Sequence, residues 1–157
     1  MLGPVIPVEA LHPGTDPALA AELVALQRVA YAVEELLIGH PVPVAAEDPG
    51  ALAAAGFAWW GCRDADGLLG AVAVREAAEL LDVERLFVAP RAFRRGIGSA
   101  LVAHVVAQAA GRRVIVATGQ DNHPARVLYE RAGFAVAGRA EVEPGLWVTH
   151  YAWAPAK

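Results

Sequence analysis

An apolar segment that runs into a pair of glycines beside three arginines is the part of this sequence best suited to binding an anion. Residues 86–101 read Leu-Phe-Val-Ala-Pro-Arg-Ala-Phe-Arg-Arg-Gly-Ile-Gly-Ser-Ala-Leu. Gly96 and Gly98 stand where this segment passes into a predicted helix, and backbone N–H groups at a helix N-terminus bind anions. The guanidinium groups of Arg91, Arg94 and Arg95 can reach the same anion. The segment therefore predicts a phosphate-binding turn between a strand and a helix.

A second segment, at residues 122–134, reads Asn-His-Pro-Ala-Arg-Val-Leu-Tyr-Glu-Arg-Ala-Gly-Phe. Asn122 is a typical helix N-cap, Pro124 fits the first turn, and Gly133 fits the position after the last turn. A purely structural helix explains each of these residue types. It does not explain why the segment follows a glycine turn, a helix and a strand. Two other phosphate loops are excluded, because Leu101 replaces the third glycine of a dinucleotide fingerprint and the only lysine is Lys157.

Together, the two segments resemble the coenzyme-A-binding motifs of the GNAT N-acetyltransferase superfamily. The matching features are Val88-x-Pro90, Gly96-x-Gly98 and the pattern Asn-x-Pro-Ala-x-x-Leu-Tyr-Glu-Arg-x-Gly-Phe, and the match is firm over residues 79–134. The resemblance implies an α/β (α+β) fold with a mixed, mostly antiparallel central sheet of about six or seven strands, flanked by about four helices. Phe93 departs from the family, which has Arg or Gln there, so the arginine that contacts phosphate is left open.

The resemblance also implies a set of site residues and acetyl-CoA as the cosubstrate, without a metal. The cofactor-binding set is Leu86, Phe87, Val88, Arg94, Arg95, Gly96, Ile97, Gly98, Ser99, Asn122, Ala125 and Tyr129. Backbone amides of the glycine turn would cradle the pyrophosphate, and the strand backbone at Leu86 and Val88 would pair with the pantetheine arm. The Tyr129 hydroxyl would point at the thioester sulfur. These expectations describe an enzyme that transfers acetyl directly to a primary amine.

Acidic side chains are the candidates for handling the amine. Asp82 and Glu84 lie two apart on a predicted strand and so share a face, which makes them candidates for the general base. A solvated strand edge explains them equally well. Glu34 and Glu35, near the end of the first predicted helix, are candidates for binding the acceptor ammonium. Trp59 can wall an acceptor pocket through cation–π contact.

The elements that must position these residues follow from hydrophobic periodicity and turn signals. Strands are predicted at residues 5–11, 57–63, 68–75, 79–88, 113–118, 134–142 and 146–153. Helices are predicted from a cap at Thr15 or Asp16 to Gly39, at 48–55, from Gly96 to Gly111, and at 124–132. We expect a single domain over residues 1–157, with an acceptor-side half (1–78), an acetyl-CoA core (79–134) and a terminal hairpin (134–154).

Charge and composition limit the partners. Residues 1–84 carry a net charge of −10 and residues 85–157 a net charge of +6. A cationic amine on the acidic half and a polyphosphate on the basic half would suit this division, although surface charge placed for solubility also explains it. The apolar content of 56% excludes disorder, and no apolar run has the length of a membrane span. The few basic residues lack an aromatic platform for nucleic acid.

Localisation and the alternative functions complete the expectations. The single cysteine, Cys62, fits a reducing cytoplasm, and the scattered histidines fit no metal site. The acceptor is an amine, with a small molecule slightly favoured over a protein, and the resemblance allows a homodimer. One alternative is a non-catalytic acetyl-CoA-binding sensor or interaction module. Another is an α/β domain whose glycine turn binds no cofactor.

Overall fold

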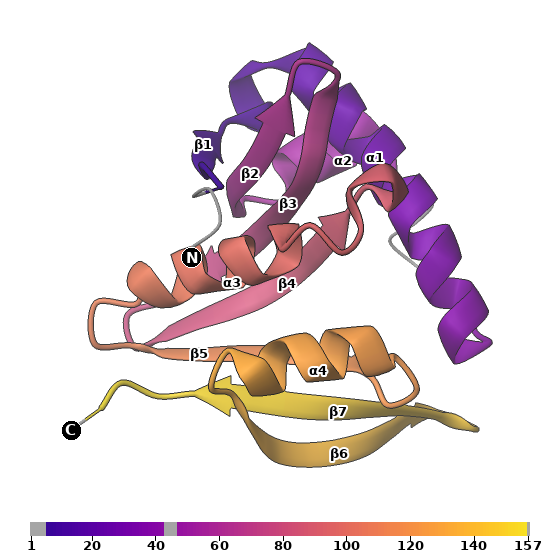
Figure 1. Ribbon diagram of the computed structural model, residues 1–157, viewed down its shortest axis with the longest axis vertical. Helices are drawn as coiled ribbons and strands as arrows, with labels where there is room; N and C mark the ends of the chain where they lie inside the picture. Colours follow the sequence, from indigo (N-terminus) through magenta and orange to yellow (C-terminus); the bar gives the residue numbers. More distant parts are fainter. Residues whose placement is uncertain (1–5, 43–46, 157) are drawn as a thin grey trace.

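Seven strands form one sheet in the computed structural model, which describes residues 6–42 and 47–156 (Figure 1). Their order is β1-β2-β3-β4-β5-β7-β6. The strands are β1 (Glu9–Leu11), β2 (Ala58–Asp64), β3 (Gly67–Glu76), β4 (Leu80–Val88), β5 (Arg113–Gly119), β6 (Ala135–Glu143) and β7 (Leu146–Trp153). Strands β4 and β5 are parallel, whereas the other neighbouring pairs are antiparallel. The mixed, mostly antiparallel sheet confirms the predicted fold class.

Helices cover both faces of the sheet. They are α1 (Pro17–Ile38), α2 (Pro49–Ala54), α3 (Ile97–Ala107) and α4 (His123–Arg131). Apolar residues of α1 and α2 form one core cluster with β2, β3 and β4, and those of α3 and α4 form another on the opposite face. Trp59 belongs to the α1–α2 cluster, whereas Trp60 packs against the other. The alternation of side chains along β2 thus places the two indoles on opposite faces.

The ends of α1 are set by local sequence. A carboxylate oxygen of Asp16 accepts a hydrogen bond from the Leu19 amide at 3.1 Å, which satisfies a free N–H of the first turn. At the other end, Gly39 adopts a φ of +68°, and its amide donates to the Glu35 carbonyl at 2.8 Å. A left-handed residue at this position favours glycine. The 22-residue helix therefore ends at the glycine predicted from sequence.

Some boundaries differ from the prediction. Helix α3 ends at Ala107 rather than at Gly111, because Ala110 and Gly111 take positive φ values of 51° and 85° and turn the chain toward β5. Among the described residues, β1 has three residues, and residue 5 of the predicted strand lies outside them. The short 3₁₀ turns at Pro13–Thr15 and Pro90–Ala92 were not predicted.

The divergence of β4 from β5 is the feature of the fold that makes room for a site. The two strands pair from Leu80 and Arg113 as far as Val83 and Val116, and beyond this point their registered pairing stops. Figure 1 shows β4 and β5 close together at one end and apart at the other. A bulge contributes to this geometry, since Val83 pairs with Val74 and Arg85 with Ala73, which leaves Glu84 as the extra residue.

Candidate active site

A cavity of about 100 Å³ lies where β4 and β5 separate. Residues from α1, β4, β5 and α4, together with Asn122 at the α4 N-terminus, line it. They are Tyr31, Glu34, Val83, Glu84, Arg85, Leu86, Val116, Ala117, Thr118, Asn122, Ala125 and Tyr129. The cavity thus unites a predicted catalytic tyrosine, a predicted acceptor-binding carboxylate and several residues of the predicted cofactor set.

Tyr129 is a buried residue of α4 whose ring is held by two other aromatic rings. Its centroid lies 5.7 Å from that of Phe134 and 5.8 Å from that of Tyr151. Burial raises the pKa of the Tyr129 hydroxyl well above its usual range, and the charge of Glu34 raises it further. The phenol therefore remains protonated at neutral pH and is available as a hydrogen-bond donor.

Asn122 at the start of α4 and Glu34 of α1 line the same cavity. The Asn122 side-chain oxygen accepts a hydrogen bond from the Ala125 amide at 3.3 Å and so caps the helix. Burial raises the pKa of the Glu34 carboxyl, an effect that the Asn122 side chain opposes and the nearby Glu35 reinforces. A carboxyl of α1 with a raised pKa thus lies at the cavity that Tyr129 also lines.

The two candidate bases on β4 lie close together. Glu84 lines the cavity and pairs with Arg75, whose Nε lies 3.2 Å from a Glu84 oxygen. Asp82 is not among the cavity-lining residues. Burial, followed by the charge of Glu84, raises the pKa of the Asp82 carboxyl. Their strand is an inner strand of the sheet, and Glu84 on it is exposed to solvent.

The turn before α3 has the backbone geometry of an anion site. Arg94 and Gly96 adopt φ values of +64° and +78°, and no side chain caps the amides at the start of α3. The amides of Ile97, Gly98 and Ser99 are thus free of such a cap. The Arg94 and Arg95 side chains are exposed at this turn, and within the described chain neither forms a hydrogen bond or ion pair.

Gly98 lies at a close approach between α3 and α4. A Cβ at this position would lie 3.2 Å from Leu128 Cδ2 and 3.8 Å from Val88 Cγ2. Val88 ends β4 and Leu128 lies on α4, so the glycine brings the predicted cofactor elements together. Ile97 beside it is buried in the core and can contribute only its backbone to a ligand at the surface.

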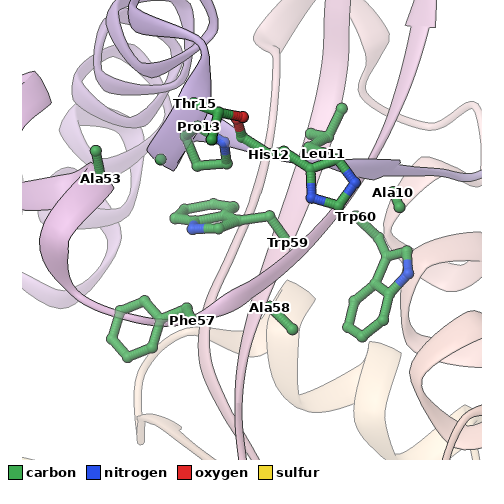
Figure 2. Close-up of a pocket in the computed structure, with 11 residues that line it drawn as sticks. Ala10, Leu11, His12, Pro13, Thr15, Ala53, Phe57, Ala58, Trp59 and Trp60 are labelled. Atoms are coloured by element: carbon green, nitrogen blue, oxygen red, sulfur yellow. The ribbon is translucent and has the colours of Figure 1, made fainter.

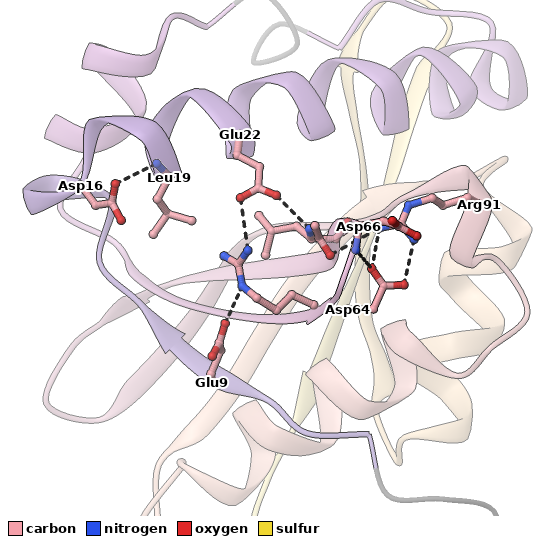
Figure 3. A network of polar contacts seen from close by, with 10 residues as sticks. Glu9, Asp16, Leu19, Glu22, Asp64, Asp66 and Arg91 are labelled. Atoms are coloured by element: carbon pink, nitrogen blue, oxygen red, sulfur yellow. Dashed lines mark hydrogen bonds and ion pairs between the residues drawn. The ribbon is translucent and has the colours of Figure 1, made fainter.

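Arg91 was expected to be able to reach an anion at the glycine turn, but in the structure its guanidinium is paired elsewhere. Its guanidinium donates to both carboxylate oxygens of Asp64, at 3.0 and 3.2 Å, as Figure 3 shows. It also donates to the carbonyls of Gly67 and Leu68. Arg91 therefore holds the β2–β3 turn against the segment after β4. Because it is engaged there, Arg94 and Arg95 are the arginines that remain for a phosphate.

Two predicted acceptor residues lie outside the cavity. Glu35 accepts a hydrogen bond from the Val42 amide at 2.8 Å and so holds the segment after α1. Trp59 lines a different cavity, of about 400 Å³, together with His12, Pro13 and Phe57 (Figure 2). It packs on Phe87, the one member of the predicted cofactor set that is buried on the α1–α2 face. The predicted acceptor residue in the smaller cavity is Glu34.

Sequence reasoning missed two features of the site. Tyr31 lines the cavity from α1, one helical turn before Glu34, and this spacing is the signal that could have identified it. Arg85 is buried, forms an ion pair with Glu47 (Nη2–Oε2 2.8 Å) and lies over the Phe57 ring at 5.1 Å. No local pattern predicts the second feature, because its partners are far apart in the sequence.

A search for metal ligands within residues 6–42 and 47–156 finds no cluster of three or more histidine, cysteine or acidic residues. Over the same residues, no helix has both the length and the apolarity needed to cross a membrane.

Comparison with known proteins shows the family. The model of the acetyltransferase (GNAT) domain matches residues 45–136. The UPF0157 protein YqkA of Bacillus subtilis (strain 168) is 32% identical over 133 residues, which make up 83% of this chain and 39% of that protein. The chain thus spans about two fifths of the length of this curated relative.

Solved structures share the fold at low sequence identity. An aminoglycoside 6'-acetyltransferase type Ii has a TM-score of 0.73 and 18% identity, covering 97% of this chain and 100% of its own. A ribosomal-protein alanine N-acetyltransferase from Escherichia coli has a TM-score of 0.72 and 14% identity, covering 94% and 92%. With the family match over more than half of its length, and as its two motifs predicted, this chain belongs to the GNAT acetyltransferase family.

Proposed function

We propose that this protein is an acetyl-CoA-dependent N-acetyltransferase that transfers acetyl to a primary amine by direct attack in a ternary complex. The observation that carries the proposal is the convergence of Tyr129, Glu34 and Asn122 on one cavity where β4 and β5 separate. A protonated phenol and a carboxylate are the two groups that amine acylation needs, one for the leaving thiol and one for the amine.

The described residues fit the cofactor. The uncapped amides at the start of α3, with the guanidinium groups of Arg94 and Arg95, would hold its pyrophosphate. The backbone of Leu86 and Val88 would pair with the pantetheine arm, since β4 is free of registered pairing with β5 beyond Val83. When bound, acetyl-CoA would supply a thioester whose acetyl group can be transferred.

Glu34 would act on the acceptor amine. For an alkylamine with a pKa near 10.4, only about one molecule in 2,500 is neutral at pH 7. Deprotonating the amine therefore costs about 4–5 kcal/mol of free energy. A carboxylate in a confined cavity binds the ammonium and provides a route for its proton. Glu84, on the same cavity, and its neighbour Asp82 are the alternative bases, although Arg75 neutralises part of their charge.

Tyr129 would act on the sulfur as the carbon–sulfur bond breaks and the carbon–nitrogen bond forms. Complete proton transfer from an ordinary tyrosine to a thiolate is uphill by about 2 kcal/mol, and the raised pKa of Tyr129 increases this cost. The phenol therefore stabilises the developing thiolate by donating a hydrogen bond. The proton lost by the amine completes the thiol, so the products are an amide and coenzyme A.

The non-catalytic alternative is less well supported. A module that only senses acetyl-CoA would need the α3 turn, but not a phenol and a carboxylate facing each other across a cavity. For the acceptor, the aminoglycoside and ribosomal-protein enzymes of the same fold represent a small-molecule and a protein class. We favour a small amine slightly, because the cavity is small.

The first experiment is calorimetric titration with acetyl-CoA, with Gly98→Trp as the control. We expect saturable binding that the variant loses, because a bulky side chain at position 98 would meet Leu128 and Val88. Thiol release is then measured with a panel of primary amines. Binding without thiol release for any amine would favour the sensor, and absence of binding would overturn both versions.

A further inference from the structure

The Tyr31 hydroxyl is accessible from the cavity and has no hydrogen-bond partner among the described residues. The residue is 6% exposed, and its hydroxyl forms no hydrogen bond within residues 6–42 and 47–156. The hydroxyl is not among the fully buried polar atoms that lack a partner, so it opens onto the cavity that Tyr31 lines. A phenol that is accessible and not already paired is available to donate to, or accept from, a polar atom of a ligand.

The surroundings of Tyr31 indicate what that atom is. Tyr31 and Glu34 lie three residues apart and so share a face of α1, and both line the cavity with Tyr129. The charge of Glu34 acts on both phenols, which places all three groups close together. The Tyr129 hydroxyl likewise has no hydrogen-bond partner among the described residues. In the proposed function, Tyr129 donates a hydrogen bond to the thioester sulfur, whereas Tyr31 has no assigned role.

We propose that the Tyr31 hydroxyl binds the attacking nitrogen of the acceptor and, with its ring, selects amines on an unbranched carbon. This inference rests on the proposed function and deepens it. The hydroxyl oxygen accepts an N–H of the neutral amine, which orients the nitrogen lone pair, while the phenol proton can bond to Glu34. Tyr31 and Glu34 then bind the amine on the α1 side of the cavity, with Tyr129 on the α4 side.

The size of the cavity supports selection against branching. Its volume is about 100 Å³, and it opens to the surface, so the space beside the polar groups is narrow while the rest of an acceptor can extend outward. Val83, Leu86 and Val116 form apolar walls beside the polar groups. A second substituent on the carbon that bears the amine would have to displace one of these walls or the Tyr31 ring.

The Tyr31 ring is not free to move aside. It packs edge-on against Phe87, with centroids 5.8 Å apart and planes at 79°. Phe87 in turn lies 6.0 Å from Trp59, which is 3% exposed. This series of buried rings supports the wall of the cavity from behind, so the site discriminates by shape as well as by hydrogen bonding.

Tyr31→Phe tests the role of the hydroxyl. We expect kcat/KM for butan-1-amine to fall about 10- to 100-fold, with the Kd for acetyl-CoA unchanged, because one hydrogen bond to the reacting nitrogen is lost. The melting temperature should stay the same, since the hydroxyl that is removed has no hydrogen-bond partner among the described residues. A purely structural hydroxyl would instead lower the melting temperature and leave kcat/KM unchanged, which would overturn the inference.

Tyr151→Phe is the matched control. Tyr151 is 1% exposed, and its hydroxyl accepts a hydrogen bond from Arg126 Nε at 3.1 Å. Removing this partnered hydroxyl should lower the melting temperature by about 2–4 °C. The value of kcat/KM should stay within about threefold. If Tyr31 binds the acceptor, Tyr31→Phe should therefore lose activity without losing stability, and Tyr151→Phe should lose stability without losing activity.

The amine selectivity is tested with butan-1-amine and butan-2-amine, which differ only in branching at the carbon that bears nitrogen. We expect kcat/KM to be at least about 10-fold higher for butan-1-amine than for butan-2-amine. This ratio should be smaller in Tyr31→Ala, because the substitution widens the cavity. Equal rates for both amines in the native protein would overturn the inference alone. If acetyl-CoA binds but none of the amines causes thiol release, both the proposed transferase function and this inference are overturned.

Discussion

Two cavities lined by described residues lie on either side of the Phe87 ring and differ in what lines them. The larger, of about 400 Å³, is lined by Phe57, Trp59, Trp60 and other residues among which His12 is the only titratable side chain. The smaller, of about 100 Å³, is lined by two tyrosines, two glutamates and an arginine. Phe87 contacts Trp59 of the first and Tyr31 of the second.

This difference shows that volume alone does not identify a reactive site. Chemistry requires polar groups that converge, and only the smaller cavity brings together a phenol and a carboxylate whose pKa values are both raised by burial. The smaller cavity also lies where β4 and β5 separate, next to the elements that would hold a cofactor. Trp59, which lines the larger cavity, packs on the Phe87 ring behind Tyr31.

The largest expected effect comes from Tyr129→Phe. Turnover in the thiol-release assay should fall about 10²- to 10³-fold, because a hydrogen bond to the developing thiolate is lost. The calorimetric Kd for acetyl-CoA should change by less than about threefold. Equal losses in turnover and affinity would instead mean that Tyr129 only packs against Phe134 and Tyr151, and the smaller cavity would lose its catalytic role.

Glu34→Gln should lower kcat/KM for amines by about 10- to 50-fold, since the neutral amide cannot take up the amine proton. The native pH–rate profile should rise as Glu34 ionises, at a pH above the usual range of a glutamate because its pKa is raised. The variant should lack this rise. If Glu34→Gln has the same pH–rate profile as the native protein, Glu34 is not the base, and Glu84 or Asp82 becomes the candidate.

Glu34 also makes a prediction for stability. Its folded-state pKa is raised, so the folded protein binds more protons than the unfolded chain between the unfolded pKa, about 4.3, and the folded one. Stability of the native protein should therefore fall as the pH rises through this window. Denaturation of Glu34→Gln over the same pH range should lack this decrease. A parallel decrease in the variant would assign the effect to other groups.

The smallest expected effect belongs to the larger cavity. His12→Ala should change kcat/KM for any amine by less than about twofold, because the exposed imidazole lines only the larger cavity. Its melting temperature serves as the folding control. An increase in the amine KM of tenfold or more would contradict the comparison and make the larger cavity the acceptor site.

Much of the fold followed from local signals. The strand that carries Trp59, the cap at Asp16 and the stop at Gly39 are all present as predicted. These features depend on neighbours a few residues away. The bulge at Glu84 was not predicted, because it depends on the register between β3 and β4.

The sequence by itself determined the family, the glycine turn before α3 and the helix that carries Asn122 and Tyr129, because each rests on short-range backbone preferences and a contiguous motif. Only the folded structure shows that Arg91 pairs with Asp64 and that Tyr31, Glu34 and Tyr129 line one cavity. These contacts join residues that are far apart in the chain. They exist only because the sheet order and the divergence of β4 from β5 bring α1 and α4 to the same cavity.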